Sequence, residues 1–168
     1  IDLGDVETFE PIGGTADYKF GGIYDGRGHA IAGLKVSESR GTSYRAGLFG
    51  ELAPGAAVHS LTLDRPVIRS AQSYAGSVAG YSAAHVHDIK VAGADVAGSS
   101  LSGSYYGGVL GISVNAAVTE DITVQGGSVT GADFVSSIVG NCNGAKIRRC
   151  VSNMDVVRLP SNQDSPRY

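Results

Sequence analysis

The chain has 168 residues, a net charge of −3 and only 17% charged residues. Its Lys and Arg residues are scattered along the sequence, whereas a nucleic-acid surface needs clustered cations, so we expect no nucleic-acid partner. No apolar run reaches the roughly 18 residues of a membrane-spanning helix, so we expect no membrane insertion. Glycine is abundant (25 residues), without a collagen-like period. Together with many Val, Ala and Ser residues, this favours a turn-rich all-β chain.

One seven-residue motif recurs along the chain: an aromatic residue, small residues, a mostly apolar pair and a closing glycine. Clear copies span 44–50, 74–80, 105–111 and 134–140, and a weaker copy spans 20–26. The closing glycines lie 24, 30, 31 and 29 residues apart and are Gly26, Gly50, Gly80, Gly111 and Gly140. Self-similarity at such a period is typical of a stacked solenoid.

A second pattern of three apolar residues follows each closing glycine. It reads Val-x-x-Leu-x-Leu at 58–63 and Val-x-x-Ile-x-Val at 86–91, while Val118 with the pair at 122–124 is one residue out of step. The last two apolar positions have the period of a strand, and another apolar residue follows four or five positions later. Each unit therefore predicts three short strands and three turns.

Two other repeat folds were weighed against these patterns. Helical repeats are disfavoured because Gly inside every segment costs about 1 kcal/mol each in a helix and β-branched residues occupy the repeated positions. A leucine-rich repeat fits the strand at 58–63. Its asparagine position is instead occupied by Pro66, Ala94, Gly127 and Asp155.

We therefore predict an all-β, right-handed parallel β-helix of about five coils, with roughly 30 residues per coil. Residues 1–19 are expected to cap the first coil, 20–157 to form the repeats and 158–168 to be a linker or disordered tail. The five closing glycines are expected to be structural corners that turn with positive φ and stack closely on the neighbouring coil. Inward positions should stack like on like, for example Leu61, Ile89, Ile122 and Cys150.

The early repeats resemble a known family. The Gly-Leu-Phe-Gly run at 47–50, followed by the pattern at 58–63, resembles the GLUG-type repeat, and residues 11–34 resemble the unit that often precedes it. Such repeats occur in large secreted or cell-surface bacterial proteins, including adhesins and the N-terminal regions of immunoglobulin A1 metalloproteases. The resemblance implies a β-solenoid in an exported bacterial protein, with any protease zinc motif outside this segment.

Motifs of catalysis and cofactor binding are not found in the sequence. It lacks His-Glu-x-x-His, Gly-x-Ser-x-Gly and a phosphate loop, so we expect no cofactor and no metal. His59 and His87 occupy the same position in successive units, with His85 on the same strand face. As neighbours they are close enough to share a metal, but two solvent-facing side chains in register explain them more simply.

A carbohydrate-active β-helix enzyme, of the polysaccharide lyase or glycosidase type, is the alternative function. Such an enzyme needs paired carboxylates in register on one outer face. Asp64 with Asp95, and Asp88 with Glu120, are roughly aligned in the repeat. Neither pair has the accompanying basic residues that an acidic polysaccharide requires.

The aromatic column formed by the motif is the candidate binding surface. Tyr44, Tyr74 and Tyr105 are followed in it by Phe134, and Tyr106 lies beside the Ser- and Gly-rich loop at 97–104. These rings either stack on a host glycan or protein or pack on one another to close a seam of the solenoid. Phe134 lacks a hydroxyl group, which suits packing.

The two cysteines leave the redox environment open. Cys142 and Cys150 flank a turn-like segment, so a local disulfide and two small buried thiols are both compatible with the sequence. We expect a non-catalytic scaffold or binding segment of a secreted or cell-surface bacterial protein. Its expected partners are a host protein or glycan and other domains of the same polypeptide.

Overall fold

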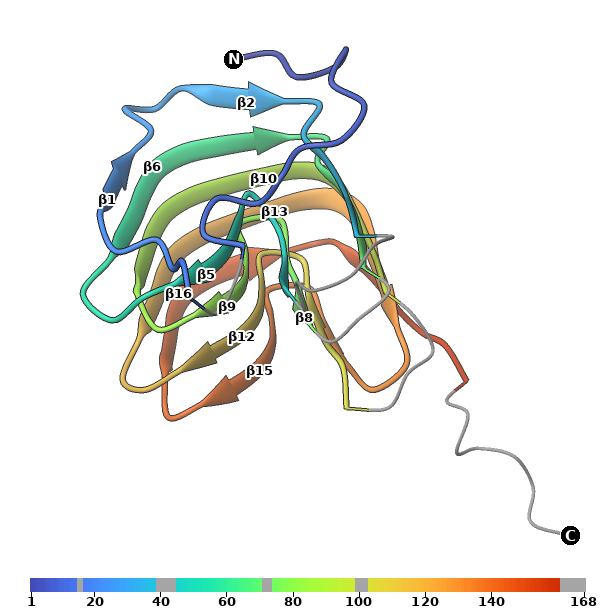
Figure 1. Cartoon of the computed structure of the whole chain (residues 1–168). Coiled ribbons are helices and arrows are strands. Elements are labelled where there is room, and N and C mark those ends of the chain that lie inside the picture. The colour runs from blue at the N-terminus through green and yellow to red at the C-terminus, as the bar shows by residue number, and fades with distance from the viewer. Residues whose placement is uncertain (15–16, 39–44, 71–73, 99–102, 161–168) are drawn as a thin grey trace, which may run out of the picture.

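The computed structural model describes residues 1–14, 17–38, 45–70, 74–98 and 103–160. These residues form an all-β solenoid of parallel strands with about four turns and about 29 residues per turn (Figure 1). The predicted parallel β-solenoid is therefore confirmed. One sheet is five rungs deep and the other two are four deep, so the expected five coils correspond to about four complete turns. No helix in the described ranges is long and apolar enough to cross a membrane.

Three parallel sheets surround the core. Sheet 1 contains β1 (Ile23–Asp25), β2 (Ala30–Ala32), β3 (Lys35–Glu38), β6 (Ala57–Asp64), β7 (Val67–Ser70), β10 (His85–Gly98), β13 (Val118–Gly131), β16 (Lys146–Ser152) and β17 (Asp155–Arg158). Sheet 2 contains β4 (Arg45–Ala46), β8 (Tyr74–Ala75), β11 (Tyr105–Gly107) and β14 (Phe134–Ser136). Sheet 3 contains β5 (Phe49–Leu52), β9 (Ala79–Ser82), β12 (Leu110–Val114) and β15 (Val139–Asn143).

The division of each coil into strands differs from the expected three segments. The aromatic-glycine motif splits into two short strands, such as β8 and β9, which belong to different sheets. The two later segments join into one strand of 14 residues in β10 and again in β13. The long strand remains continuous because it bends without breaking the ladder to its neighbours.

The inward columns have the predicted composition. Strand register places Leu61, Ile89, Ile122 and Cys150 opposite one another in successive rungs. Val118 is one residue out of step, as the sequence indicates: it pairs with His85, and Thr119 takes the inward position opposite Val86. The one-residue offset noted in the sequence is therefore the substitution of Thr for an inward valine.

Two columns of left-handed residues bend sheet 1, within its long strands or between its shorter ones. The first is Ser60, Asp88, Asp121 and Arg149, with φ between 51° and 55°; these residues lie between paired positions of successive strands. The second is Gly33, Arg65, Gly93 and Gly126, with φ between 50° and 67°. Left-handed backbone costs a non-glycine residue roughly 1–2 kcal/mol, so the first column is held by the stacking of the rungs around it.

The five closing glycines do not turn as expected. Gly26, Gly50, Gly80, Gly111 and Gly140 are not among the residues of positive φ. The close stacking is confirmed: a Cβ at Gly80 would lie 2.7 Å from Arg45 Cα, and one at Gly111 would lie 2.5 Å from Gly80 O. These positions require glycine because backbone of the neighbouring rung occupies the space of a side chain.

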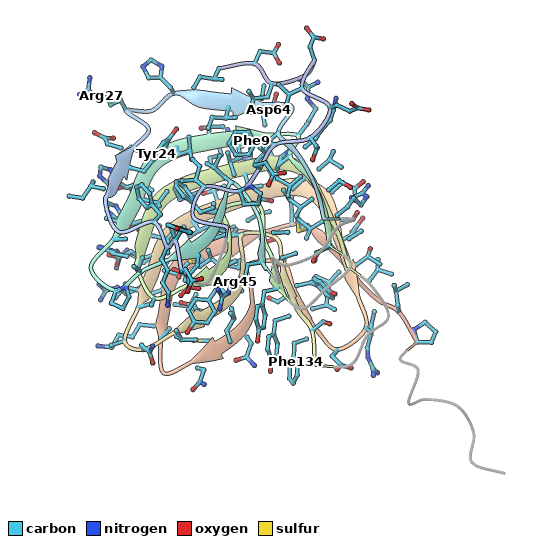
Figure 2. The ribbon with its side chains drawn as sticks, in the orientation of Figure 1. Phe9, Tyr24, Arg27, Arg45, Asp64 and Phe134 are labelled. Carbon is cyan, nitrogen blue, oxygen red and sulfur yellow. The ribbon has the colours of Figure 1, made fainter. Side chains whose placement is uncertain are left out.

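The N-terminal segment lies across the first rung. Leu3 and Ala32 are joined by a backbone hydrogen bond, and Ile12 and Phe20 form isolated bridges to Phe49 and Leu52. Phe9 and Phe20 pack against the core. Figure 2 shows Phe9 near the end of the molecule that holds the N-terminus and Phe134 at the opposite side.

Candidate functional site

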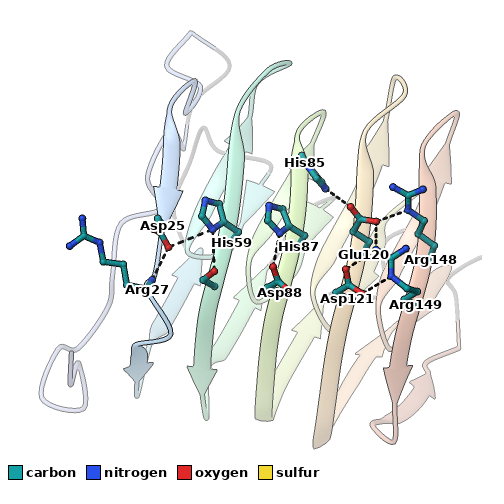
Figure 3. A network of polar contacts seen from close by, with 11 residues as sticks. Asp25, Arg27, His59, His85, His87, Asp88, Glu120, Asp121, Arg148 and Arg149 are labelled. Atoms are coloured by element: carbon teal, nitrogen blue, oxygen red, sulfur yellow. Dashed lines mark hydrogen bonds and ion pairs between the residues drawn. The ribbon is translucent and has the colours of Figure 1, made fainter.

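A band of polar side chains crosses the outer face of sheet 1 at its first bend (Figure 3). The pattern apolar-x-x-apolar places two adjacent residues outward, and the second of them has left-handed φ. The band, called the polar ladder below, contains Asp25 on β1, His59 and Ser60 on β6, His87 and Asp88 on β10, Glu120 and Asp121 on β13, and Arg148 and Arg149 on β16. His85 on β10 lies beside it.

Three histidines form its central part. The rings of His59 and His87 are stacked with centroids 4.8 Å apart and planes 9° apart. His85 contacts His87 with a centroid distance of 4.3 Å. The expectation that His59 and His87 are neighbours is confirmed. Each of these two rings also contacts a carboxylate. His59 Nδ1 is 3.5 Å from Asp25 Oδ1 on the neighbouring strand, and His87 Nδ1 is 2.8 Å from Oδ2 of the adjacent Asp88.

Glu120 connects the histidines to the arginines of the last rung. Its Oε1 lies 2.7 Å from His85 Nε2, and its Oε2 accepts hydrogen bonds from Arg148 Nε at 2.5 Å and Arg149 Nη2 at 2.6 Å. Only 7% of the residue is exposed. The hydrogen bond from Arg148, followed by that from His85, lowers the pKa of Glu120 to about 2. The carboxylate is therefore ionised at neutral pH.

Asp121 and Arg149 form a second, bidentate pair. Arg149 Nε donates to Asp121 Oδ1 at 2.6 Å and Arg149 Nη2 donates to Asp121 Oδ2 at 2.7 Å. These hydrogen bonds lower the pKa of Asp121 and raise the pKa of Arg149. Fork-to-fork geometry of this kind is the strongest form of Arg–carboxylate contact, and it joins β13 to β16 beyond the backbone ladder.

The carboxylate pairs considered from the sequence are arranged differently. Asp64 pairs with Ala92, and Asp95 pairs with Val67, so Asp64 and Asp95 are not aligned. Glu120 lies opposite His87, which places Asp88 beside Asp121 instead. Sequence reasoning also missed the contacts of Glu120 with the arginines. The signal that could have found these contacts is the repeated pair of outward positions between two apolar residues, which places Glu120 and the arginines in one band.

The aromatic column forms on the outer side of sheet 2. Tyr74, Tyr105 and Phe134 are in register on β8, β11 and β14. The rings of Tyr74 and Tyr105 are parallel within 2° and 5.4 Å apart, and those of Tyr105 and Phe134 are 4.9 Å apart. Both faces of Tyr105 are thus occupied by neighbouring rings. Phe134, 49% exposed, is the end of this stack. Tyr44, also predicted for the column, lies outside the described residues.

Tyr106 does not lie at the surface. It is fully buried and belongs to the core, so its ring is not accessible to a partner. A Cβ at either Gly98 or Gly131 would overlap this ring. Two glycines in successive rungs therefore create the space for a tyrosine at a position where the preceding rungs have Ala46 and Ala75.

A buried ion-pair cluster lies at the other end of the aromatic column. Glu51 on β5 is 2% exposed and forms ion pairs with Lys19 at 2.7 Å and with Arg45. The Arg45 guanidinium also lies 5.0 Å from the centre of the Tyr81 ring. The cluster ties the N-terminal segment to sheets 2 and 3, and the aromatic motif gave no signal for it.

The two cysteines are the remaining reactive side chains considered from the sequence. Cys142 is exposed, Cys150 is partly buried, and both are free thiols; burial raises the pKa of Cys150. Across the described ranges, no group of three or more His, Cys, Asp or Glu residues is arranged to hold a metal ion. Comparisons with protein-family models, with curated proteins and with solved structures found no match for this chain.

Proposed function

We propose that this chain is a non-catalytic β-solenoid scaffold and binding segment of a secreted or cell-surface bacterial protein. It is either adhesin-like or an accessory region of an immunoglobulin A protease-like enzyme. The observation that carries this proposal is that most ionisable groups of the polar ladder contact a side chain of the neighbouring rung, through ion pairs or the stacking of His59 on His87. They tie rungs together, as expected of a rod that displays its loops and faces to partners.

The state of Glu120 argues against general acid catalysis. A glycosidase acid needs a raised pKa, so that it holds a proton near neutral pH. The pKa of Glu120 is instead lowered to about 2, and both of its oxygens accept hydrogen bonds or contact His85. A carboxylate committed in this way serves the stability of β10, β13 and β16.

The second candidate is a carbohydrate-active enzyme, and the contact between His85 and Glu120 favours it. An exposed imidazole oriented by a buried carboxylate is an arrangement used by general bases. The test is incubation with a panel of neutral and acidic polysaccharides, with assays for new reducing ends and for unsaturated products. We expect no turnover; turnover that His85→Ala abolishes while the fold is retained would replace the scaffold with the enzyme.

The binding role is tested with glycan arrays and with pull-down of purified host proteins. Because the faces of Tyr105 are occupied by Tyr74 and Phe134, we expect a ligand to contact the outward ring edges and the open end at Phe134. Replacing Tyr74 and Phe134 with Ser should weaken binding. Tyr18→Ser, at an exposed tyrosine of the N-terminal segment, is the matched control. Blank arrays and pull-downs with folded protein would reduce the proposal to a spacer.

A further inference from the structure

The exposed large apolar side chains of the described chain are confined to the two ends of the solenoid. Ile1, Ile12, Tyr18 and Ile23 belong to the N-terminal segment or the first rung, and Phe134, Ile147, Val151, Val156 and Val157 belong to the last rung. The intervening rungs have none in the described ranges. Exposed apolar groups gathered in this way mark contact surfaces more often than single scattered ones do.

The last rung leaves its inward columns uncovered. Val156 pairs with Val129 in register, yet Val156 is 50% exposed and Val129 is fully buried. Ile147 pairs with Thr119 and shows the same contrast, at 41% against 0%. Both last strands of sheet 1, β16 and β17, pair only with β13 among the described strands. Their other backbone edge, which is unpaired within the described ranges, is a template for a further strand.

The two ends also have opposite charge. Residues 1–19 contain one basic residue, Lys19, which is paired with Glu51, and five acidic residues: Asp2, Asp5, Glu7, Glu10 and Asp17. The last rung of sheet 1, residues 146–158, contains four basic residues and one acidic residue: Lys146, Arg148, Arg149, Arg158 and Asp155. Arg148 and Arg149 have side chains more than half exposed even though they contact β13. Opposite charges at two apolar surfaces steer them toward each other.

We propose that this chain associates head to tail with a second copy of itself, the N-terminal segment of one molecule docking on the last rung of the other. All three sheets are parallel, so this is the arrangement that keeps the direction of stacking. It covers Val156 with the N-terminal segment and Ile147 with the first rung, where Tyr24 begins the inward column that Ile147 ends. It also brings the acidic residues to the basic rung. The contact is heterologous, so it repeats and grows into a linear assembly. This inference does not depend on the proposed binding function.

The test is sedimentation velocity over a range of protein and salt concentrations. We expect the mean mass to grow beyond a dimer as protein concentration rises, and to fall with added salt because the charges are screened. Glu7→Lys and Lys146→Glu should each weaken association about fivefold, because each reverses one charge of the two complementary ends. Lys90→Glu, an exposed position on the middle rung β10, is the control for charge alone.

The apolar part of the contact is tested separately. Val156→Asp should abolish association, whereas Val151→Asp should not, because Val151 pairs with Thr123 on the outer face of the sheet while Val156 continues the buried inward column of Val129. Circular dichroism checks that each variant remains folded. A monomeric mass at every concentration, a closed dimer that does not grow, or association that is insensitive to both Lys146→Glu and Val156→Asp would overturn the proposal.

Discussion

The inward column of sheet 1 contains one polar residue that lacks a partner. Thr119 is fully buried opposite Val86, and no hydrogen-bond partner is found for its Oγ1 among the described residues. Burying an unpaired hydroxyl group costs about 1–3 kcal/mol. We expect Thr119→Val to raise the free energy of unfolding by about 1 kcal/mol, measured by urea denaturation. Thr123→Val, half-buried on the outward side of the same strand, should have little effect. Destabilisation by Thr119→Val would show that the hydroxyl group is satisfied.

Glu120 should make stability depend on pH in the acidic range. Its pKa is about 2 in the folded chain against an ordinary value of 4.5, so protonation is easier in the unfolded chain. The stabilisation is fully present above pH 4.5 and is lost as the pH falls toward 2. We therefore expect the stability difference between wild type and Glu120→Gln to shrink from pH 6 to pH 2, measured by urea midpoints at each pH. Glu10→Gln, an exposed carboxylate of the N-terminal segment, is the control, and a constant difference would contradict the assignment.

At the scale of the strand, the left-handed bends determine which residues share a face. In each strand the first bend leaves two consecutive side chains outward, such as His87 and Asp88, and so creates the polar ladder. At the second bend the free-energy cost of left-handed backbone can be measured without a steric clash. Gly126 has φ of 64°, and a Cβ there would meet no atom within 4 Å.

Gly126→Ala should therefore measure the backbone cost of that bend. We expect it to lower the free energy of unfolding by about 1–2 kcal/mol, and Gly126→Asn to cost less because Asn tolerates this conformation. Gly21→Ala is the control, since Gly21 has open space and no positive φ. The measurement is equilibrium unfolding in urea. Equal stability of Gly126→Ala and wild type would mean that the strand does not bend at this residue.

The repeats predicted the parallel stacking and most of the register, because apolar residues recur where rungs meet. They did not predict the first bend, since Ser60 and Arg149 have no preference for left-handed φ, and the modest preference of Asp88 and Asp121 does not mark a bend as glycine would. The closing glycines were expected both to turn with positive φ and to stack closely on the neighbouring rung, and only the close backbone approach requires them. Tyr106 looked like a surface residue of a loop. Its inward position depends on Gly98 and Gly131, which lie in other strands and are matched to it only in the folded chain.

At the scale of the whole molecule, the two ends of the solenoid are covered unequally. A rung is stabilised by its own residues and by its contacts with adjacent rungs. The middle rungs have neighbours on both sides, and the N-terminal segment covers the first rung. In the described part of the chain, β16 and β17 of the last rung pair with β13 alone, and most of their residues are exposed.

Opening of the native chain should therefore begin at the last rung. In hydrogen exchange of the dilute, monomeric protein we expect backbone amides of β16 and β17 to exchange fastest among the sheet 1 strands of the repeats, and those of β10 to exchange near the rate set by global unfolding. Glu120→Gln should speed exchange in β16 further, because it weakens the contacts with Arg148 and Arg149, and should leave β6 unchanged. Equal protection of β16 and β10 in the monomer would contradict this prediction. It would mean that the chain unfolds as one cooperative unit and that the last rung does not open locally.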